Sequence, residues 1–295
     1  MTRPFALLLL FLWTHPVDAQ SSDPLTRPNR PKVKDRDWCQ NPIDYFVLDQ
    51  LEKAGSKPAP EADRATLIRR LSLDLTGQSA TSREVDIFLA DKSLRAYEKV
   101  VERLLASPRF GERMGQLWFD AEGCRADGEP TTRRWRDWMV AAFNANMPLD
   151  QIMREQTSSP MKMDEMPSPS PPRRGSCDQP AILRVFVVPS PNSAMARDAV
   201  DRYWRMLFGV GLESTELRDW LSSELREPSL INCCRLDEPL PHAWDVKHLL
   251  KAIATSATYR SSGCRFRGSA QLQGEKSLTQ RRKAAETNRG ALILP

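Results

Sequence analysis

Short amphipathic segments, each with its own helix start or stop signal, follow one another along residues 41–156 and constrain the fold more than any other feature. Asn41 precedes Pro42 and an apolar face that stops at Gly55, and residues 61–77 repeat this pattern with a glycine at the end. Asparagine and proline favour helix starts, and glycine favours helix ends. No stretch alternates apolar and polar residues as a half-buried strand does. The sequence therefore predicts a mainly α fold.

Further helices are predicted in the same region. A capping box begins at Thr81, Ser93 is expected to cap the next helix, and Pro108 is expected to end it. Two more helices are predicted over residues 111–120 and around residues 135–143. Together these segments predict a multi-helix domain over residues 41–156.

The N-terminus has the pattern of a secretory signal peptide over residues 1–19. Arg3 precedes an apolar run at residues 5–13, and small residues follow at cleavage-site spacing. A membrane-spanning helix needs roughly 20 apolar residues, so we expect cleavage and no stable membrane span, although an uncleaved N-terminal anchor remains an alternative. The mature protein is expected in the periplasm or outside the cell, and residues 20–40 are expected to be disordered.

The second half of the chain is less regular. Residues 157–192 are rich in proline and serine and are expected to form a linker; within them, residues 182–188 have β-like composition and could form one strand or a packed linker segment. Apolar residues at helical spacing return over residues 193–260, which predicts a small, incomplete second helical domain. Residues 261–295 show little periodicity and are expected to be a disordered tail.

Charge and cysteine usage exclude several classes of protein. The net charge is only +5, and acidic and basic residues are interspersed along the predicted helices, which argues against nucleic-acid binding. The six cysteines include no CxxC, so the chain has no CxxCH motif for covalent haem, and their disulfide pairing cannot be deduced. Only two histidines, His242 and His248, follow the signal segment, and there is no HExxH, GxSxG, P-loop or GxGxxG motif. We expect no metal and no cofactor in this chain.

Several sequence blocks resemble, in order, a known family of two-domain proteins. The N-terminal blocks are residues 43–77, residues 96–113 and RWRDWMVAAFNANMPLDQIMREQ at residues 134–156. The C-terminal blocks are residues 193–212, residues 216–227 and WDVKHLLKAIATSATYR at residues 244–260. They resemble exported planctomycete-type proteins that contain two domains of unknown function and often carry or neighbour a cytochrome c domain. The resemblance implies a cytochrome c domain or another envelope protein as a partner.

The chain departs from this family pattern in three places. The segment after Trp118 and Asp120, AEGCRAD at residues 121–127, fits the family loosely. Residues 228–243 form an insertion, and the ordered region expected between the two domains is replaced by the proline-rich segment. The chain therefore looks like a shortened, divergent member.

Charged residues are the weak candidates for chemistry, namely Asp74, Asp120, Arg136 and Asp137. Their structural interpretation is a network of arginines and carboxylates that ties helices together, or, for Asp74, a hydrogen bond to the backbone of the following turn. Because Arg136 and Asp137 are adjacent in a helix, each is expected to need another partner. Their enzymatic interpretation is a pair of carboxylates for acid and base chemistry, as in glycoside cleavage. The tryptophans could line a sugar-binding cleft, but their helical spacing favours core packing.

Three hypotheses for function follow. The first is an exported helical interaction or accessory module that works with cytochrome c proteins. The second is an extracytoplasmic enzyme that acts on polysaccharide through carboxylates. The third is a degenerate, non-functional copy whose helices remain.

Overall fold

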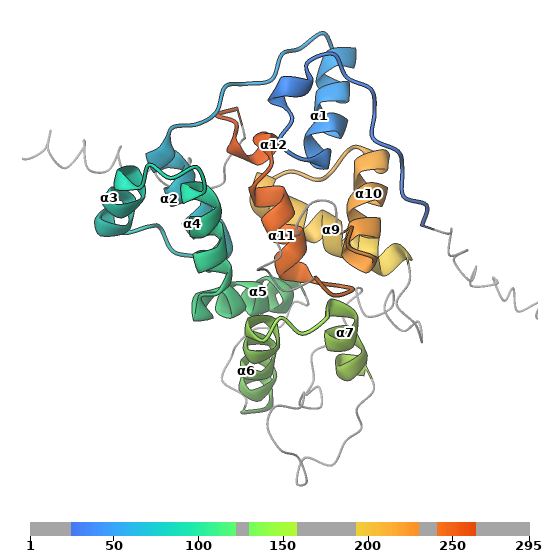
Figure 1. The fold of residues 1–295 in the computed structure, drawn as a ribbon. Helices are drawn as coiled ribbons and strands as arrows, with labels where there is room; N and C mark the ends of the chain where they lie inside the picture. Colours follow the sequence, from blue (N-terminus) through green and yellow to red (C-terminus); the bar gives the residue numbers. More distant parts are fainter. Residues whose placement is uncertain (1–24, 122–129, 158–192, 230–240, 264–295) are drawn as a thin grey trace, which may run out of the picture.

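The computed structural model describes residues 25–121, 130–157, 193–229 and 241–263, and within these ranges the protein is helical, with no strand (Figure 1). The one β-bridge among these residues joins Glu61 and Ser261. The prediction of a mainly α fold is confirmed. The elements are η1 (Arg36–Trp38), α1 (Pro42–Lys53), α2 (Arg64–Thr76), α3 (Ser82–Ala90), α4 (Ala96–Leu105), α5 (Pro108–Ala121), α6 (Pro130–Asn144), α7 (Leu149–Thr157), α9 (Ser193–Phe208), α10 (Thr215–Arg226), α11 (Val246–Ala254) and α12 (Ala257–Arg260).

Most of the predicted helix boundaries are confirmed by the capping contacts. The Asn41 side chain accepts a hydrogen bond from the Ile43 backbone N–H at 3.0 Å, and Gly77 ends α2 in the left-handed conformation with φ of 71°. The capping box at Thr81 is present. The Asn41 and Thr81 side chains satisfy backbone N–H groups that have no partner inside the helix, and the left-handed backbone of Gly77 ends α2.

Two local predictions differ from the structure, and one helix was not predicted. Ser93 does not cap α4, because Arg95 occupies the N-cap position without a side-chain hydrogen bond. Pro108 begins α5 instead of ending α4, which already stops at Leu105; proline fits the first turn of a helix because its missing N–H would have no partner there. Helix α7 was not predicted, although Leu149, Ile152 and Met153 form its short buried stripe.

One continuous hydrophobic core joins the two halves of the chain. Helix α1 packs on α10 and α12, and α11 lies at the centre of the molecule, against α4, α10 and α12 (Figure 1). The ring centroids of Phe46 and Trp220 lie 6.1 Å apart, and the Trp118 Nε1–H donates to the Tyr203 hydroxyl at 3.1 Å. The helices of residues 41–157 and those of residues 193–260 therefore stabilise each other.

The tryptophans lie mainly in this core, as their helical spacing predicted. Trp135 is partly buried and packs against the core. The buried tryptophans are Trp118, Trp138, Trp204, Trp220 and Trp244.

The segment before α1 is packed on the fold from residue 25 onward, unlike the disorder expected for residues 20–40. Arg27 forms an ion pair with Glu224 at 3.0 Å, Val33 is buried, and the Arg30 guanidinium lies 5.7 Å from the centroid of the Tyr45 ring. These long-range contacts give the segment partners that its composition does not reveal.

Several predictions concern residues outside the described ranges. They are the signal peptide at residues 1–19, the linker from residue 158 to residue 192 with its β-like run, most of the insertion at residues 228–243, and the tail from residue 264 onward. In the described part of the chain, no helix combines the length and the apolar character that crossing a membrane requires.

Candidate functional site

Asp74 lies near the end of α2 and is buried against the C-terminal helices. Its side-chain Oδ2 accepts a hydrogen bond from the Tyr259 hydroxyl at 2.7 Å. The Asp74 carboxyl therefore contacts α12, 185 residues further along the chain, and not the backbone of the turn that follows α2. The turn-backbone hypothesis for Asp74 is wrong.

Arg70 extends the same contact one helical turn earlier on α2. Its Nη1 donates to the Tyr259 carbonyl at 2.6 Å and to the Ser261 carbonyl at 3.0 Å. Residues four apart lie on one face of a helix, so Arg70 and Asp74 hold the backbone and the side chain of Tyr259 together. The two residues clamp α12 onto α2.

Burial raises the pKa of Asp74 from its ordinary value of 3.8 to about 7. The Tyr259 hydroxyl and the positive charges of Arg113 and Arg70 oppose this rise, but they are the smaller causes. Burial also raises the pKa of Tyr259. A carboxyl with such a pKa can exchange a proton near neutral pH, yet the side chain is 7% exposed and its hydroxyl partner belongs to the same packed core.

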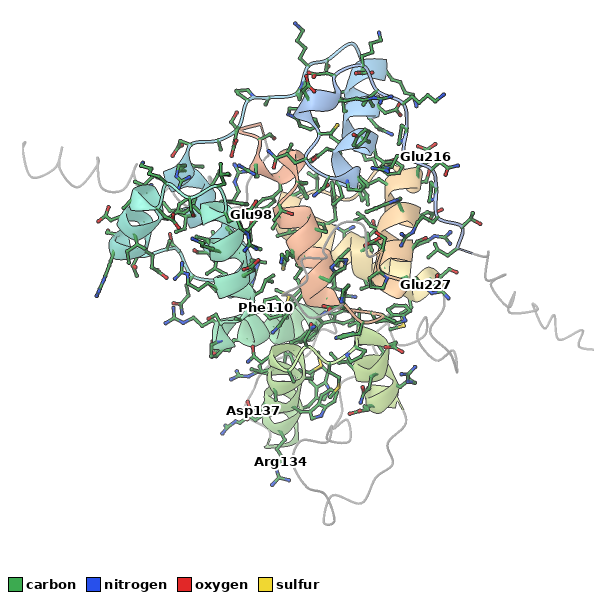
Figure 2. All side chains as sticks on the ribbon, viewed as in Figure 1. Glu98, Phe110, Arg134, Asp137, Glu216 and Glu227 are labelled. Carbon is green, nitrogen blue, oxygen red and sulfur yellow. The ribbon has the colours of Figure 1, made fainter. Side chains whose placement is uncertain are left out.

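The remaining candidate residues are not part of this cluster. Arg136 and Asp137 are exposed on α6, where their side chains lie 3.9 Å apart; they contact each other, contrary to the expectation of separate partners. In Figure 2, Asp137 lies at the opposite end of the molecule from α1. Asp120 belongs to α5, and its side chain lies outside the described residues. The structure therefore does not bring Asp74 together with Asp137.

A second buried carboxylate, Asp44, has a structural role that the sequence did not indicate. Its oxygens accept hydrogen bonds from the backbone N–H groups of Ala257 and Thr258, at 3.0 and 2.8 Å. They also accept from the backbone N–H groups of Gln40 and Asn41, at 2.9 and 3.0 Å. Asp44 therefore caps α1 and α12 at once.

A third buried carboxylate, Glu224 of α10, joins three distant segments. Arg27 contacts it at 3.0 Å, His248 Nε2 of α11 lies 3.1 Å from it, and Ser229 donates to it from both backbone and side chain. Burial alone would raise the pKa of Glu224, but these partners together lower it below its usual value. The cavity beside His248 measures about 60 Å³, far below the roughly 300–1,000 Å³ of typical ligand sites.

A large groove formed by described residues lies between η1, the segment at residues 56–61, and α12. Its volume is about 650 Å³. Four carboxylates line it, from Asp35, Asp37, Glu52 and Glu61, against two cations, Lys57 and Arg260. Trp38, Leu48 and two prolines provide an apolar wall. We call this feature the acidic groove.

Two of the four carboxylates in the acidic groove already have partners within the protein. Glu61 pairs with Arg260, whose Nε lies 2.9 Å away, and Glu52 accepts from the backbone N–H of Lys34 at 2.9 Å. Asp35 and Asp37 are exposed and form no ion pair with a described residue. These two carboxylates are available to a cationic partner.

The chemistry of Cys39 is consistent with negative charge beside the acidic groove. Cys39 follows Trp38 and forms no disulfide with a described residue. Burial raises the pKa of its thiol to about 11, and the carboxylates of Asp44, Asp35 and Glu52 add to the rise. A thiol in this environment is a weak nucleophile, since the thiolate is the reactive form.

Metal binding receives no support from the described side chains. Among the residues of the four described ranges, no group of three or more histidine, cysteine, aspartate or glutamate side chains could hold a metal ion. The acidic groove was not predicted from sequence because its walls come from residues 35–61 and from residues 257 and 260, which only the fold brings together. The closely spaced charges around Trp38 were the one available signal.

Comparison with known proteins assigns the chain to a family. Residues 42–210 match PSCyt2, described as a protein of unknown function (DUF1549), and residues 182–288 match PSD1, described as a protein of unknown function (DUF1553). No curated protein and no solved structure matches the chain. The first match covers more than half of the 295 residues and the second follows in the order that the sequence blocks indicated, so the chain belongs to the PSCyt2 (DUF1549) family, with a PSD1 (DUF1553) region at its C-terminal side.

Proposed function

We propose that the protein is an exported binding module that holds a basic partner protein in the acidic groove, and that the partner is a cytochrome c protein or another envelope protein. The observation that carries the proposal is the pair of exposed carboxylates, Asp35 and Asp37, next to the half-buried Trp38. Aromatic residues are enriched at interface centres, and charges at the rim steer oppositely charged partners. An open groove with this lining suits protein binding.

The enzymatic alternative has weaker support. For the carboxylates that the sequence suggested, glycoside cleavage would require that both face one open cleft, whereas Asp74 is buried behind Tyr259 and Asp137 is exposed on α6. The structure thus offers no reason to combine these two residues in a reaction. A binding role requires no such combination.

Binding can be tested with a purified c-type cytochrome that has a lysine-rich surface. We expect the affinity to fall as the salt concentration rises, because ions screen exposed charges beyond about 10 Å at 0.1 M salt. Asp35→Lys with Asp37→Lys should weaken binding by about tenfold or more, which is the effect of about 1.4 kcal/mol. The matched control, Asp86→Lys with Glu213→Lys, changes the net charge equally at exposed positions outside the groove.

The possible outcomes test the proposed binding surface and the proposed partner separately. Equal losses in the two double variants would show that net charge alone drives binding, and would remove the groove from the proposal. If the cytochrome does not bind even at low salt, it is not the partner, and that part of the proposal fails. Export is checked independently by N-terminal sequencing of the secreted protein, which is expected to begin at Gln20.

A further inference from the structure

We infer that the acidic groove holds the chain's own C-terminal segment, residues 264–295, and that a binding partner must displace this segment. The second part of the inference rests on the proposed function. The first part does not, because it concerns only the protein by itself.

The last described residues place the start of this segment at the edge of the acidic groove. The Ser262 backbone N–H donates to the Pro60 carbonyl at 2.8 Å, and Ser261 forms a bridge with Glu61. Gly263 lies so close to Ala59 that an added Cβ would be 3.0 Å from the Ala59 Cβ. Ala59, Pro60 and Glu61 all line the groove. The chain therefore leaves its last described contact beside Glu61, one of the four carboxylates that line the groove.

Charge makes the C-terminal segment the complementary occupant. Residues 264–295 contain seven lysine and arginine residues and two glutamates, a net charge of +5. The whole chain also has a net charge of +5, so the remaining residues are balanced overall. All of the excess positive charge lies in the segment that begins beside Glu61, at the edge of the groove that Asp35, Asp37 and Glu52 also line.

The first residues of the segment also match the apolar wall of the groove. Cys264 is followed by Arg265, Phe266 and Arg267, an aromatic residue between two guanidinium groups. An extended chain advances at most about 3.3–3.6 Å per residue, so Arg267 cannot lie farther than about 14 Å from Gly263. The groove offers the half-buried Trp38 and the exposed Pro60 for the ring, and the two exposed carboxylates for the arginines.

The tether makes a weak interaction sufficient. A short flexible connection gives an effective concentration on the order of millimolar. Individual surface ion pairs are worth at most about 1 kcal/mol, but several of them, together with the burial of one aromatic ring, can hold a segment that cannot diffuse away. A free partner must therefore bind the groove tightly enough to compete with the tethered segment.

Zero-length carbodiimide cross-linking of the full-length mature protein tests where the segment lies. Lys276 and Lys283 are the lysines of the segment, and we expect them to cross-link to Asp35 or Asp37 within one molecule. The double variant Arg265→Glu with Arg267→Glu should reduce these cross-links about tenfold, since it reverses the charges nearest the groove. The matched control is Arg133→Glu with Arg134→Glu, which makes the same charge change at exposed positions on α6 (Arg134 is labelled in Figure 2).

Hydrogen exchange gives a second readout that needs no lysine. Backbone amides of residues 34–38 and 56–61 should exchange faster in Arg265→Glu with Arg267→Glu than in the wild type, and at the wild-type rate in the control. Mixing isotope-labelled with unlabelled protein distinguishes one molecule from two. The inference is overturned if groove cross-links to the segment are absent, if they join only different molecules, or if both double variants change exchange equally.

Cytochrome binding separates this inference from the proposed function. If the segment occupies the groove and the cytochrome binds neither wild type nor Arg265→Glu with Arg267→Glu, the proposed function fails and the inference stands. If the cytochrome binds both chains equally and no cross-links form, the inference fails and the proposed function stands. If both hold, the variant should bind the cytochrome about tenfold more tightly than the wild type does.

Discussion

Replacing Asp74 with asparagine tests whether this buried carboxyl opposes folding at neutral pH. An amide has nearly the same shape as a protonated carboxyl and offers an oxygen to the Tyr259 hydroxyl, which donates to Asp74 at 2.7 Å. It cannot ionise. The substitution therefore removes the titration of Asp74 while it keeps a hydrogen-bond acceptor in place.

The magnitude follows from the pKa of Asp74, which burial raises from 3.8 to about 7. Between these pH values the unfolded chain has released the proton and the folded protein has kept it, so the contribution of Asp74 to stability falls as the pH rises through this window. Each pH unit corresponds to about 1.4 kcal/mol, which gives a total cost of about 4 kcal/mol above pH 7. Between pH 5 and pH 8 the cost grows by about 3 kcal/mol.

Urea unfolding, followed by circular dichroism at pH 5, 6, 7 and 8, measures this difference. We expect the free energy of unfolding of Asp74→Asn to rise by about 3 kcal/mol relative to wild type across this range. The control is Asp137→Asn, which removes an exposed carboxyl on α6 and should follow the wild type. Parallel curves for wild type and Asp74→Asn would refute the assigned role of burial.

Three further predictions concern the packed core. Glu224→Ala removes the shared partner of three segments and should lower the free energy of unfolding by about 3–5 kcal/mol, since it leaves buried polar groups unpaired. This loss should be smaller in acid, because the stability from a lowered carboxyl pKa disappears as the pH falls through that pKa. An equal loss at every pH would contradict this explanation. Gly111→Ala places a Cβ 2.5 Å from Asn144 Cγ in α6 and should destabilise the protein by about 1–3 kcal/mol in thermal unfolding. The control Gly211→Ala, whose nearest contact would be 3.6 Å away, should change stability little. Similar losses in the two variants would argue against the close crossing of α5 and α6. A fragment of residues 41–157 should unfold without cooperativity when alone, because α1 would lose α10 and α12, and a fragment that melts cooperatively would refute the shared core.

The sequence predicted the helical elements better than their arrangement. The caps at Asn41, Gly77 and Thr81 are local devices, so a few neighbouring residues specify them and they are present in the structure. Helix α7 was missed because its buried stripe is only two turns long. The packing of residues 25–40 depends on contacts such as Arg27 with Glu224, almost 200 positions away, which no local pattern contains.

The candidate site shows the same division between local and long-range information. Asp74 was recognised as unusual from its charge near a helix end, but its partner Tyr259 follows from the fold alone. The pairing of Arg136 with Asp137 depends on side-chain rotation, which sequence spacing does not determine. The acidic groove combines residues 35–61 with Arg260, and only the tertiary structure could show that their charges share one surface.

The shared core changes where a function for this chain should be sought. Matches to two separately described regions, residues 42–210 and 182–288, would suggest two modules with separate surfaces. Instead, the three buried carboxylates Asp44, Asp74 and Glu224 each join segments from both halves of the chain. The acidic groove is also formed from both halves, because Arg260 and Ala257 complete the walls that residues 35–61 begin. Since neither half contains the groove by itself, a binding function located there requires both regions in one folded chain, and it must be sought in the intact protein.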